Sequence, residues 1–346
     1  MYLNNIKRGS VLLTLVFLLV ACQQQQSAAK KTYPLHYSDA IFGTTFTIKV
    51  SNLPDSVSTK EVRGQVKQLL DNLNAHMSTY QPDSELSVIN ANQSNDWLSV
   101  STPLYTVLKQ AQKISELSSG AFDITVGPLV NLWGFGPDPI SFVAPADTVI
   151  KQHLTTLGYQ NLLFNDKNQT IKKTIAELYL DLSAIAKGYA VDQVGLLLES
   201  LGITDYMVEI GGELKLKGHN ISNKPWRIAV EKPSAGNRMI QKVLPLSDIS
   251  LATSGDYRNY FELEGVRFSH TIDPRTGKPI THKLASITIL SDTTMKADAL
   301  ATALMVLGSE QGFELAEQQN IAALFIIKTD DGFVEKASSS FVARLR

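Results

Sequence analysis

Hydrophobic residues with helical spacing predict three long helices. The first is expected from Ser58 to Met77, where one face is lined by Val62, Val66, Leu69, Leu70, Leu73 and Met77. The second should start at Thr102-Pro103, because proline fits the first turn of a helix, and should run to about Leu117. The third should run from Asp292 to Leu307 and end at Gly308, since glycine commonly stops a helix.

Short β-rich runs lie between the later helices, and turn residues separate them at the spacing expected for antiparallel pairing. These runs are DYMVEI, ELKLKG, WRIAVEK, KVLPLS, ISLAT, VRFSHTI and LASITIL. Two further strands are expected at Ile41 to Val50, interrupted by Gly43, and at Ile321 to Lys328. Because strands come in runs and helices are grouped at both ends, the pattern favours an α+β fold with mainly antiparallel or mixed sheets flanked by helices.

Two segments combine regular structure with shaped loops. Ser118 to Pro137 is too rich in glycine and aromatic residues for a regular element, and we expect a long loop that lines a site. The segment YLDLSAIAKGYAVDQVGLLLESLG predicts a short strand that ends near Asp181, followed by a helix that stops at Gly202. No internal repeat or strong linker divides the chain into independent domains.

The composition is that of an ordinary globular protein. Of 346 residues, 44% are hydrophobic, which is enough for a substantial core. Lysine and arginine number 32 against 33 acidic residues, which leaves a formal charge of -1. Nucleic-acid binding usually needs a broad basic field, so the composition argues against a nucleic-acid partner.

The first residues have the organisation of an export signal. Lys7 and Arg8 precede the apolar run VLLTLVFLLVA, which is shorter than the ~20 apolar residues that span a bilayer. This pattern predicts a signal peptide over residues 1–21. The last residues of that run and Cys22 resemble a bacterial lipobox, in which the cysteine is acylated, with palmitate as one expected chain. The alternative is that this single cysteine is a small buried hydrophobe.

Acylation of Cys22 would make the chain an exported lipoprotein. The polar stretch QQQQSAAKK then predicts a flexible tether, so that residues 22–34 hold the lipidated cysteine and the tether. Two or more acyl chains give stable membrane anchoring. We therefore expect the remainder of the chain to work outside the cytoplasm, at a membrane surface.

Two short motifs place polar groups on helices. Asp298 and Thr302 are four residues apart and project from one face, where both offer oxygen to a hard cation such as Mg²⁺. The alternative is an acid favoured by the helix dipole beside a half-buried threonine. Lys187-Gly188 falls in the first turn of a helix, where free N–H groups and a lysine suit a phosphate, although a solvated lysine is also common there.

Two loops offer further chemistry. Gly211-Gly212-Glu213 predicts a tight hairpin, or else a place where backbone meets a flat ligand. The loop SHTIDPRTGKPI, from Ser269 to Ile280, brings His270, Asp273 and Arg275 together. It is either a surface turn or part of a catalytic site.

The order of these motifs along the chain resembles the ApbE family of bacterial FAD:protein FMN transferases. The resemblance runs from about Ile41 to near the C-terminus and rests on GTTF, MSTYQPDSELSVIN, SSGAFDITVGPLVNLWGFGP, LDLSAIAKGYAVD, EIGGELKLKG, ATSGDYRNYF, SHTIDPRTGKPI and DALATALMVLG. It implies a single large ApbE-like domain of two lobes over residues 35–346. It also implies Mg²⁺-dependent cleavage of FAD as substrate, transfer of the FMN moiety to a threonine hydroxyl of an acceptor protein, and release of AMP.

The resemblance also assigns site residues. The family's metal ligands, carried over by motif, fall on Asp298, on Thr302 and on the main-chain carbonyl of Ala184, which are all oxygen donors. The family's flavin contacts fall on Phe42, Tyr80, Ala121, Phe122, Asp123, Asp181, Lys187 and Ile272. Phe42 is a departure, because the family commonly has methionine before its GTT. Asp298, as the ligand of a catalytic metal, counts with His270 among the catalytic residues.

His270 is the candidate general base, because an imidazole with its ordinary pKa of about 6.5 accepts a proton near neutral pH. Asp273 and Arg275 would then orient its loop or hold phosphate. Two other functions stay open at this stage: a Mg²⁺-dependent FAD pyrophosphatase that gives FMN and AMP, and a non-catalytic FAD-binding lipoprotein. The family further implies acceptor subunits of membrane redox complexes, such as the Na⁺-translocating NADH:quinone reductase and Rnf complexes. Such acceptors favour the periplasmic side of the inner membrane.

Overall fold

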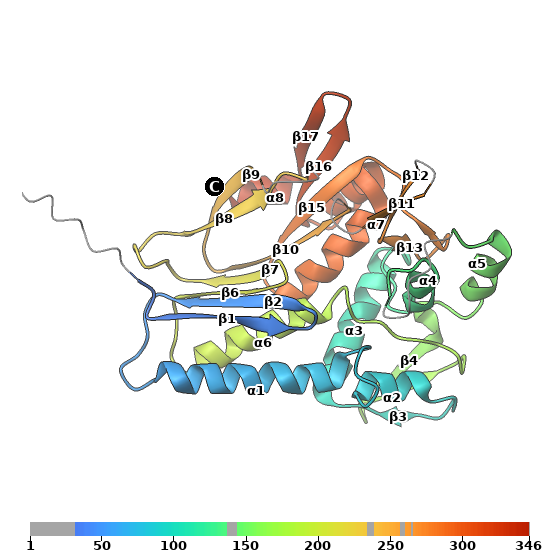
Figure 1. Ribbon diagram of the computed structural model, residues 1–346, viewed down its shortest axis with the longest axis horizontal. Helices are drawn as coiled ribbons and strands as arrows, with labels where there is room; N and C mark the ends of the chain where they lie inside the picture. Colours follow the sequence, from blue (N-terminus) through green and yellow to red (C-terminus); the bar gives the residue numbers. More distant parts are fainter. Residues whose placement is uncertain (1–31, 137–143, 234–238, 257–259, 264–265, 346) are drawn as a thin grey trace, which may run out of the picture. The chain divides into compact units, whose positions relative to one another are not determined.

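An eight-stranded sheet, antiparallel throughout, organises the chain (Figure 1). The computed structural model describes residues 32–136, 144–233, 239–256, 260–263 and 266–345. Tyr33–Arg346 forms one compact unit. Along the sheet, the strands are β1 (Leu35–Ile41), β2 (Thr44–Val50), β6 (Tyr206–Ile210), β7 (Glu213–Lys217), β10 (Ile249–Gly255), β15 (Leu284–Ser291), β16 (Ala322–Thr329) and β17 (Gly332–Ala337).

Four helices cover one face of this sheet: α1 (Thr59–Met77), α3 (Thr102–Leu117), α6 (Ala186–Ser200) and α7 (Thr294–Gln318). Between them lies the main core. Every second residue of β2 points into this core, so that Phe46, Ile48 and Val50 are buried while Thr45 is exposed. Among the described residues, no helix is long and apolar enough to cross a membrane.

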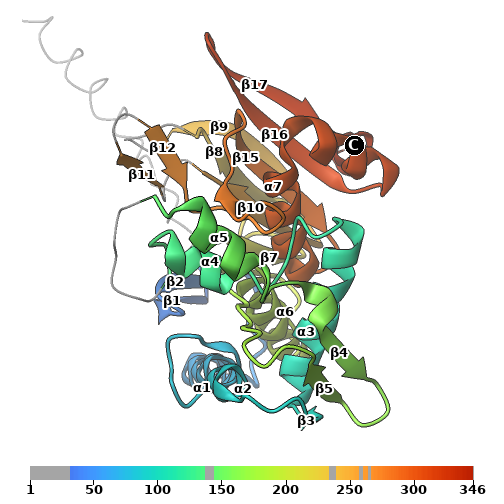
Figure 2. The same ribbon diagram turned by 90° about the vertical axis from the view of Figure 1, so that its right-hand side faces the viewer.

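The opposite face carries the β8–β9 hairpin, formed by β8 (Trp226–Glu231) and β9 (Ile240–Leu246), and the short helix α8 (Ser339–Arg344). Leu214 and Leu251 of the sheet pack there with Ile228 and Val230 of β8. The remaining elements lie around the ends of these layers (Figures 1 and 2). They are α2 (Glu85–Ala91), β3 (Leu98–Ser99), α4 (Gly127–Leu132), α5 (Asp147–Leu154), β4 (Leu162–Asn165), β5 (Thr170–Lys173), β11 (Tyr260–Leu263), β12 (Val266–Ser269), β13 (Ile272–Asp273) and β14 (Lys278–Pro279), with a 3₁₀ turn at Tyr159–Asn161.

The α+β class is confirmed. Helices α1 and α3 start within a residue of the predicted positions, because Ser58 and Ser101 cap them by accepting hydrogen bonds from the N–H groups of Glu61 and Leu104. Gly202 stops α6 in the left-handed conformation, with φ of 76°. The predicted signal peptide (1–21) and Cys22 lie outside the described residues.

The prediction of a single strand over Ile41 to Val50 is wrong. The chain turns back at Phe42 and Gly43, whose φ angles are 53° and 71°, and Ile41 pairs with Thr44. Two central residues with positive φ are typical of a type I′ hairpin turn, which matches the twist of antiparallel strands. The expected interruption is therefore the turn between β1 and β2.

The strand predicted near Asp181 does not form either. The extended backbone at Leu180 pairs with the side chain of Asn90, which accepts from the Leu180 N–H at 2.8 Å and donates to its carbonyl at 2.9 Å. The Asp181 N–H donates to the carbonyl of Ile124 at 2.7 Å. The Asn90 side chain and the Ile124 carbonyl thus take the backbone hydrogen bonds that a neighbouring strand would otherwise make.

Gly308 kinks the third predicted helix and does not end it. Its φ of 78° and ψ of -172° interrupt the helix, but the chain resumes helical geometry as far as Gln318. A Cβ at position 308 would lie 2.8 Å from Cδ2 of His282. The kink is therefore a point of close approach, which only glycine permits.

Candidate active site

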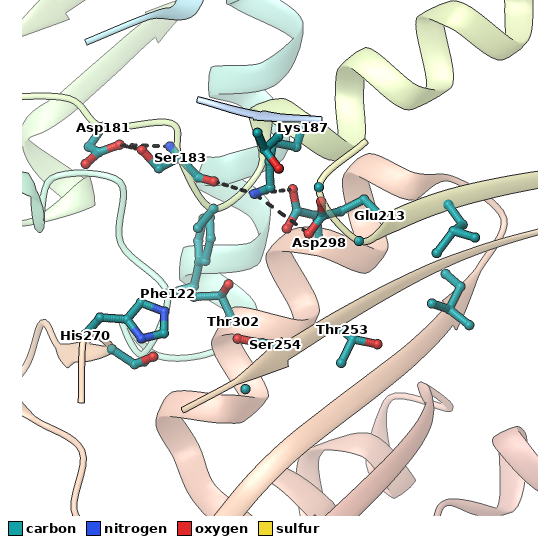
Figure 3. A pocket seen from close by; sticks show the side chains of 18 of the residues that line it. Phe122, Asp181, Ser183, Lys187, Glu213, Thr253, Ser254, His270, Asp298 and Thr302 are labelled. Carbon is teal, nitrogen blue, oxygen red and sulfur yellow. Dashed lines mark hydrogen bonds and ion pairs between the residues drawn. The ribbon is translucent and has the colours of Figure 1, made fainter. Parts of the chain in front are cut away.

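A cleft of about 1240 Å³ opens where the helices meet one end of the sheet. Its walls come from segments far apart in the sequence: the loop after α3, the start of α6, the turn between β6 and β7, the end of β10, the segment after β12 and one face of α7. Figure 3 shows the polar side chains of these segments facing a common space. The fold thus assembles one site from most of the predicted motifs.

Lys187 lies at the centre of a buried acid–lysine cluster, which we define as Lys187, Asp298 and Glu213 (Figure 3). Its Nζ is 3.9 Å from Oδ2 of Asp298 and 3.7 Å from Oε1 of Glu213. The same nitrogen donates a hydrogen bond of 3.0 Å to the carbonyl of Ser183. The side chains of both acids are less than 10% exposed, so they interact with the lysine in a region of weak solvent screening.

The charges of this cluster depend on one another. Burial alone would lower the pKa of Lys187, but Asp298, Glu213 and Asp181 raise it above its ordinary value, which keeps the amine cationic. Burial raises the pKa of Glu213 to about 8, with Lys187 opposing the rise and Asp298 adding to it. Burial also raises the pKa of Asp298, against the effect of Lys187 and the Gly188 N–H. Two carboxylates share one cation, and a second cation would therefore be favourable here.

Oxygen atoms suited to Mg²⁺ lie beside this cluster. The N–H of Gly188, which in a regular helix would donate to the carbonyl of Ala184, donates instead to Oδ2 of Asp298 at 3.0 Å. Among the described residues, the Ala184 carbonyl therefore lacks its helical partner. Ala184, Asp298 and Thr302 all line the cleft. In addition, Oε2 of Glu213 is buried and has no hydrogen-bond partner in the described structure.

These donors fit the few protein ligands, supplemented by phosphate and water, with which Mg²⁺ is commonly held. A group of three or more histidine, cysteine or acidic side chains placed to hold a metal is not found among the described residues. The predicted set does not need such a group, since it combines one carboxylate with one hydroxyl and one carbonyl. The Mg²⁺ site accordingly stays a prediction.

A second acid–lysine pair holds α7 in place. Asp192 of α6 accepts hydrogen bonds from the backbone N–H groups of Thr294 and Met295, at 3.0 and 2.9 Å, and from Nζ of Lys215 at 3.2 Å. A carboxylate at the N-terminus of a helix satisfies free N–H groups and interacts well with the helix dipole. Asp298 lies one turn further along α7. By holding the start of this helix, Asp192 therefore fixes the position of Asp298 relative to the cleft.

The loop after α3 presents Ala121 and Phe122 to the cleft, and Asp123 supports it from within. Oδ1 of Asp123 accepts from the N–H and the hydroxyl of Thr125, and Oδ2 accepts from the N–H of Tyr159 at 2.8 Å. Burial raises the pKa of Asp123, and these hydrogen bonds oppose the rise. The carboxylate therefore holds the loop in shape.

The loop that carries His270 is held by its own residues and by Trp133. Arg275 donates to both carboxylate oxygens of Asp273, from Nε at 2.9 Å and from Nη2 at 2.8 Å. Nε1 of Trp133, at the C-terminal end of α4, donates to the carbonyl of Gly277 at 2.8 Å and joins this loop to that helix. The prediction that Ser118 to Pro137 contains no regular element is therefore wrong at Gly127–Leu132. His270 lines the cleft, with its ring centroid 6.3 Å from that of Phe135. In this arrangement, Asp273 and Arg275 orient the loop.

The structure brings all but one of the predicted cleft residues together. The cleft is lined by Tyr80, Ala121, Phe122, Asp123, Asp181, Ala184, Lys187, His270, Ile272, Asp298 and Thr302. Tyr80 stands at the rim with 70% of its surface exposed. Phe42 is absent from this lining, because it occupies the β1–β2 turn and packs against the main core.

Sequence reasoning missed the part of Glu213 in the cluster. The Gly211-Gly212 hairpin was foreseen and is confirmed, since the two glycines join β6 and β7 with φ of 63° and 108°. Glu213 shares its face of β7 with Lys215 and Lys217, so the alternating pattern of the strand gave no sign that this acid is buried. Ser254, at the end of β10, also lines the cleft and carried no signal of its own.

A cleft with an exposed tyrosine at its rim, aromatic walls and a buried acid–lysine cluster defines an α+β enzyme site suited to a ligand that combines a ring system with phosphate. The family model described as the ApbE family matches residues 42–325. The chain belongs to the ApbE family.

Proteins similar in sequence carry one name. The chain is 47% identical over 331 residues to an FAD:protein FMN transferase of Vibrio cholerae, a match that covers 96% of this chain and 97% of that relative. It is 43% identical to an FAD:protein FMN transferase of Haemophilus influenzae, with 96% of each covered.

Solved structures of flavin transferases have a similar fold. The flavin transferase ApbE from Vibrio cholerae superposes with a TM-score of 0.84 at 47% identity, covering 89% of this chain and 98% of that one. The apo form of the flavinyl transferase ApbE from Pseudomonas stutzeri gives a TM-score of 0.82 at 38% identity, covering 90% and 96%.

Proposed function

We propose that this chain is an FAD:protein FMN transferase that esterifies a threonine hydroxyl of an acceptor protein. The observation that carries the proposal is the single cleft in which Asp298, Thr302, Lys187 and His270 meet an aromatic wall. The name shared by the relatives supports it. In the reaction, the threonine oxygen bonds to the phosphorus of the FMN half of FAD. The pyrophosphate bond to the AMP half breaks, and AMP leaves with the bridging oxygen.

We assign Mg²⁺ to Asp298, Thr302 and the carbonyl of Ala184. When bound, the ion supplies Lewis-acid stabilisation of the charge on the pyrophosphate oxygens. Lys187 favours the ionised forms of the two neighbouring acids, because its cation opposes the rise in pKa that burial causes. Phe122 and Tyr80 supply ring surfaces at the wall and rim of the cleft for the flavin.

We assign to His270 the removal of the proton from the threonine hydroxyl as its oxygen attacks phosphorus. It lines the same cleft as Asp298 and comes from the opposite wall in Figure 3. Asp273, Arg275 and Trp133 hold its loop, so they act as positioning residues. In-line transfer requires the attacking threonine oxygen and the leaving oxygen to lie on opposite sides of the reacting phosphorus, so the base must lie on the side from which threonine attacks, and an open position across the cleft from Asp298 supports the assignment.

Mass spectrometry separates this function from its rivals. Incubation of the enzyme with FAD, Mg²⁺ and a threonine-containing acceptor should add the mass of FMN, less one water, to the acceptor and should release AMP. Free FMN and AMP with no modified acceptor would identify a pyrophosphatase instead. Recovery of intact FAD, with no modified acceptor, would indicate a non-catalytic FAD-binding protein.

The place of action is a further proposal. Export and lipidation at Cys22, which lies outside the described residues, would hold residues 35–346 at the periplasmic side of a membrane. Acceptors of the kind found in membrane redox complexes, of the Na⁺-translocating NADH:quinone reductase or Rnf type, would then lie within reach at the inner membrane.

A further inference from the structure

The cleft extends beyond the acid–lysine cluster to one edge of β8. Five consecutive residues of this strand, Arg227 to Glu231, line it. Along a strand, side chains alternate between two faces. Here Ile228 and Val230 are buried in the core, whereas Arg227 and Ala229 are exposed. Residues from both faces of β8 border the cleft. The part of the strand that faces the cleft is therefore its backbone edge, which lies between these two faces.

The pairing of β8 with β9 shows which backbone groups this edge offers. Arg227 pairs with Pro245, which has no N–H, so this is a pair that exchanges no hydrogen bonds. Pairs alternate in an antiparallel ladder, and Ala229–Val243 is therefore of the same kind. The N–H and C=O groups of Arg227 and Ala229 consequently point away from β9.

Those groups have no other strand to pair with in the described structure. β8 and β9 form a two-stranded sheet, so β8 has a neighbour on one edge only. Backbone hydrogen bonds from Arg227 or Ala229 to other described elements are not found. An unpaired strand edge is a ready template for an additional strand.

The edge is close to the chemistry. Ile228 and Val230 pack with Leu214, and Leu214 directly follows Glu213 of the acid–lysine cluster. Thr45, Thr47 and Lys49 of β2 line the same cleft. A polypeptide lying along β8 would therefore lie in the cleft with one end near the cluster.

We propose that an extended segment of the acceptor protein pairs with the free edge of β8 and so delivers its threonine to the cleft. The inference rests on the proposed transfer to a protein hydroxyl. Recognition through backbone groups suits an acceptor because a strand edge binds the main chain of many sequences, and nearby pockets then select side chains. The segment would bring its own N–H and C=O groups to Arg227 and Ala229.

A backbone scan of a peptide tests the proposal without altering the enzyme. The probe is a short synthetic peptide with one central threonine, selected from a peptide library by FMN transfer with the wild-type enzyme. Each of its amides is then N-methylated in turn, and kcat/KM is measured. Since one backbone hydrogen bond contributes on the order of 1 kcal/mol, methylation should lower kcat/KM by about fivefold at alternate positions on one side of the threonine. Equal effects at all positions would overturn the proposal.

Substitution in β8 gives a matched comparison. Ala229→Pro removes the outward N–H while the ladder with β9 keeps its hydrogen bonds, and Ala229→Ser keeps that N–H. The proline variant should raise KM for the peptide severalfold relative to the serine variant, with kcat for bound peptide preserved. The dissociation constant of FAD, followed by flavin fluorescence, reports whether the cleft itself is intact.

The outcomes separate this inference from the proposed function. If the wild-type enzyme modifies no protein or peptide with FMN, the proposed function is wrong. If it does so while the methylation scan shows no alternation and the two Ala229 variants behave alike, the strand-pairing inference alone is wrong.

Discussion

The substitution Gly188→Ala tests whether the close contact between α6 and α7 positions Asp298 in the cleft. A Cβ at this position would lie 2.5 Å from the carbonyl oxygen of Thr294 and 2.8 Å from Cβ of Asp298. The first of these atoms belongs to the backbone of α7 and cannot rotate away. Ordinary van der Waals contact begins near 3.4 Å, so Gly188→Ala must separate the helices locally by about 0.9 Å.

The expected effects on folding and on activity differ in size. Overpacking of this kind typically costs ~1–3 kcal/mol, and alanine returns ~1 kcal/mol because it favours the helix more than glycine does. The net loss of unfolding free energy should therefore be only ~0–2 kcal/mol. Asp298 loses its hydrogen bond from the Gly188 N–H and moves with α7. Since a misplacement of ~1 Å can lower a rate by ~10²-fold, transfer should fall by about that factor while the protein stays folded.

Urea unfolding, Mg²⁺ titration calorimetry and single-turnover FMN transfer on Gly188→Ala check this prediction. Gly64→Ala in α1 is the matched control, because a Cβ there meets no atom within 4 Å and only the helix propensity changes. Wild-type transfer and wild-type Mg²⁺ affinity in Gly188→Ala would refute the reasoning that this contact positions Asp298.

Three further substitutions test other parts of the site and the N-terminus. Asp298→Ala should abolish Mg²⁺ binding in calorimetry while the protein stays folded, because Lys187 keeps Glu213 as a partner at 3.7 Å; an unchanged binding isotherm would remove Asp298 from the metal site. His270→Ala should lower single-turnover transfer by roughly 10² to 10⁴ with little change in FAD affinity, whereas transfer restored at saturating FAD would contradict a role as base. Cys22→Ser should move the protein from the detergent phase to the aqueous phase in phase partitioning, and identical partitioning of both proteins would exclude a lipid anchor.

The long helices and most strands could be predicted from the sequence because their signals are local. Ser58, Ser101 and Gly202 act on backbone groups within a few residues, and a period of two or 3.6 residues identifies a buried face without knowledge of its partner. The β1–β2 turn was missed although Gly43 is a local signal, whereas the strand near Asp181 fails because a distant residue decides the conformation. Asn90 satisfies the backbone of Leu180 across 90 positions, and no local pattern contains that pairing.

In the candidate site, too, local features could be predicted from the sequence and long-range contacts could not. The spacing of Asp298 and Thr302 places both on one face of α7, and this followed from helix geometry alone. That Gly188 would give its N–H to Asp298, across 110 positions, could not be read from either segment. Glu213 was identified as part of a hairpin, but its burial beside Lys187 depends on how β7 packs against α6.

The acid–lysine cluster is better explained by a ligand than by folding stability. Removing Asp298, Glu213 and Lys187 from water has a desolvation cost that their attraction offsets only in part, and apolar residues of similar size are often as stable. Within the described part of the chain, Oε2 of Glu213 is buried without a hydrogen-bond partner, and the Gly188 N–H is drawn away from the Ala184 carbonyl. Both features raise the energy of the free protein and place oxygen atoms toward the cleft. A cation would satisfy both oxygens and the phosphates of the ligand would bind that cation in turn, so binding energy is available at the point where the pyrophosphate bond must break.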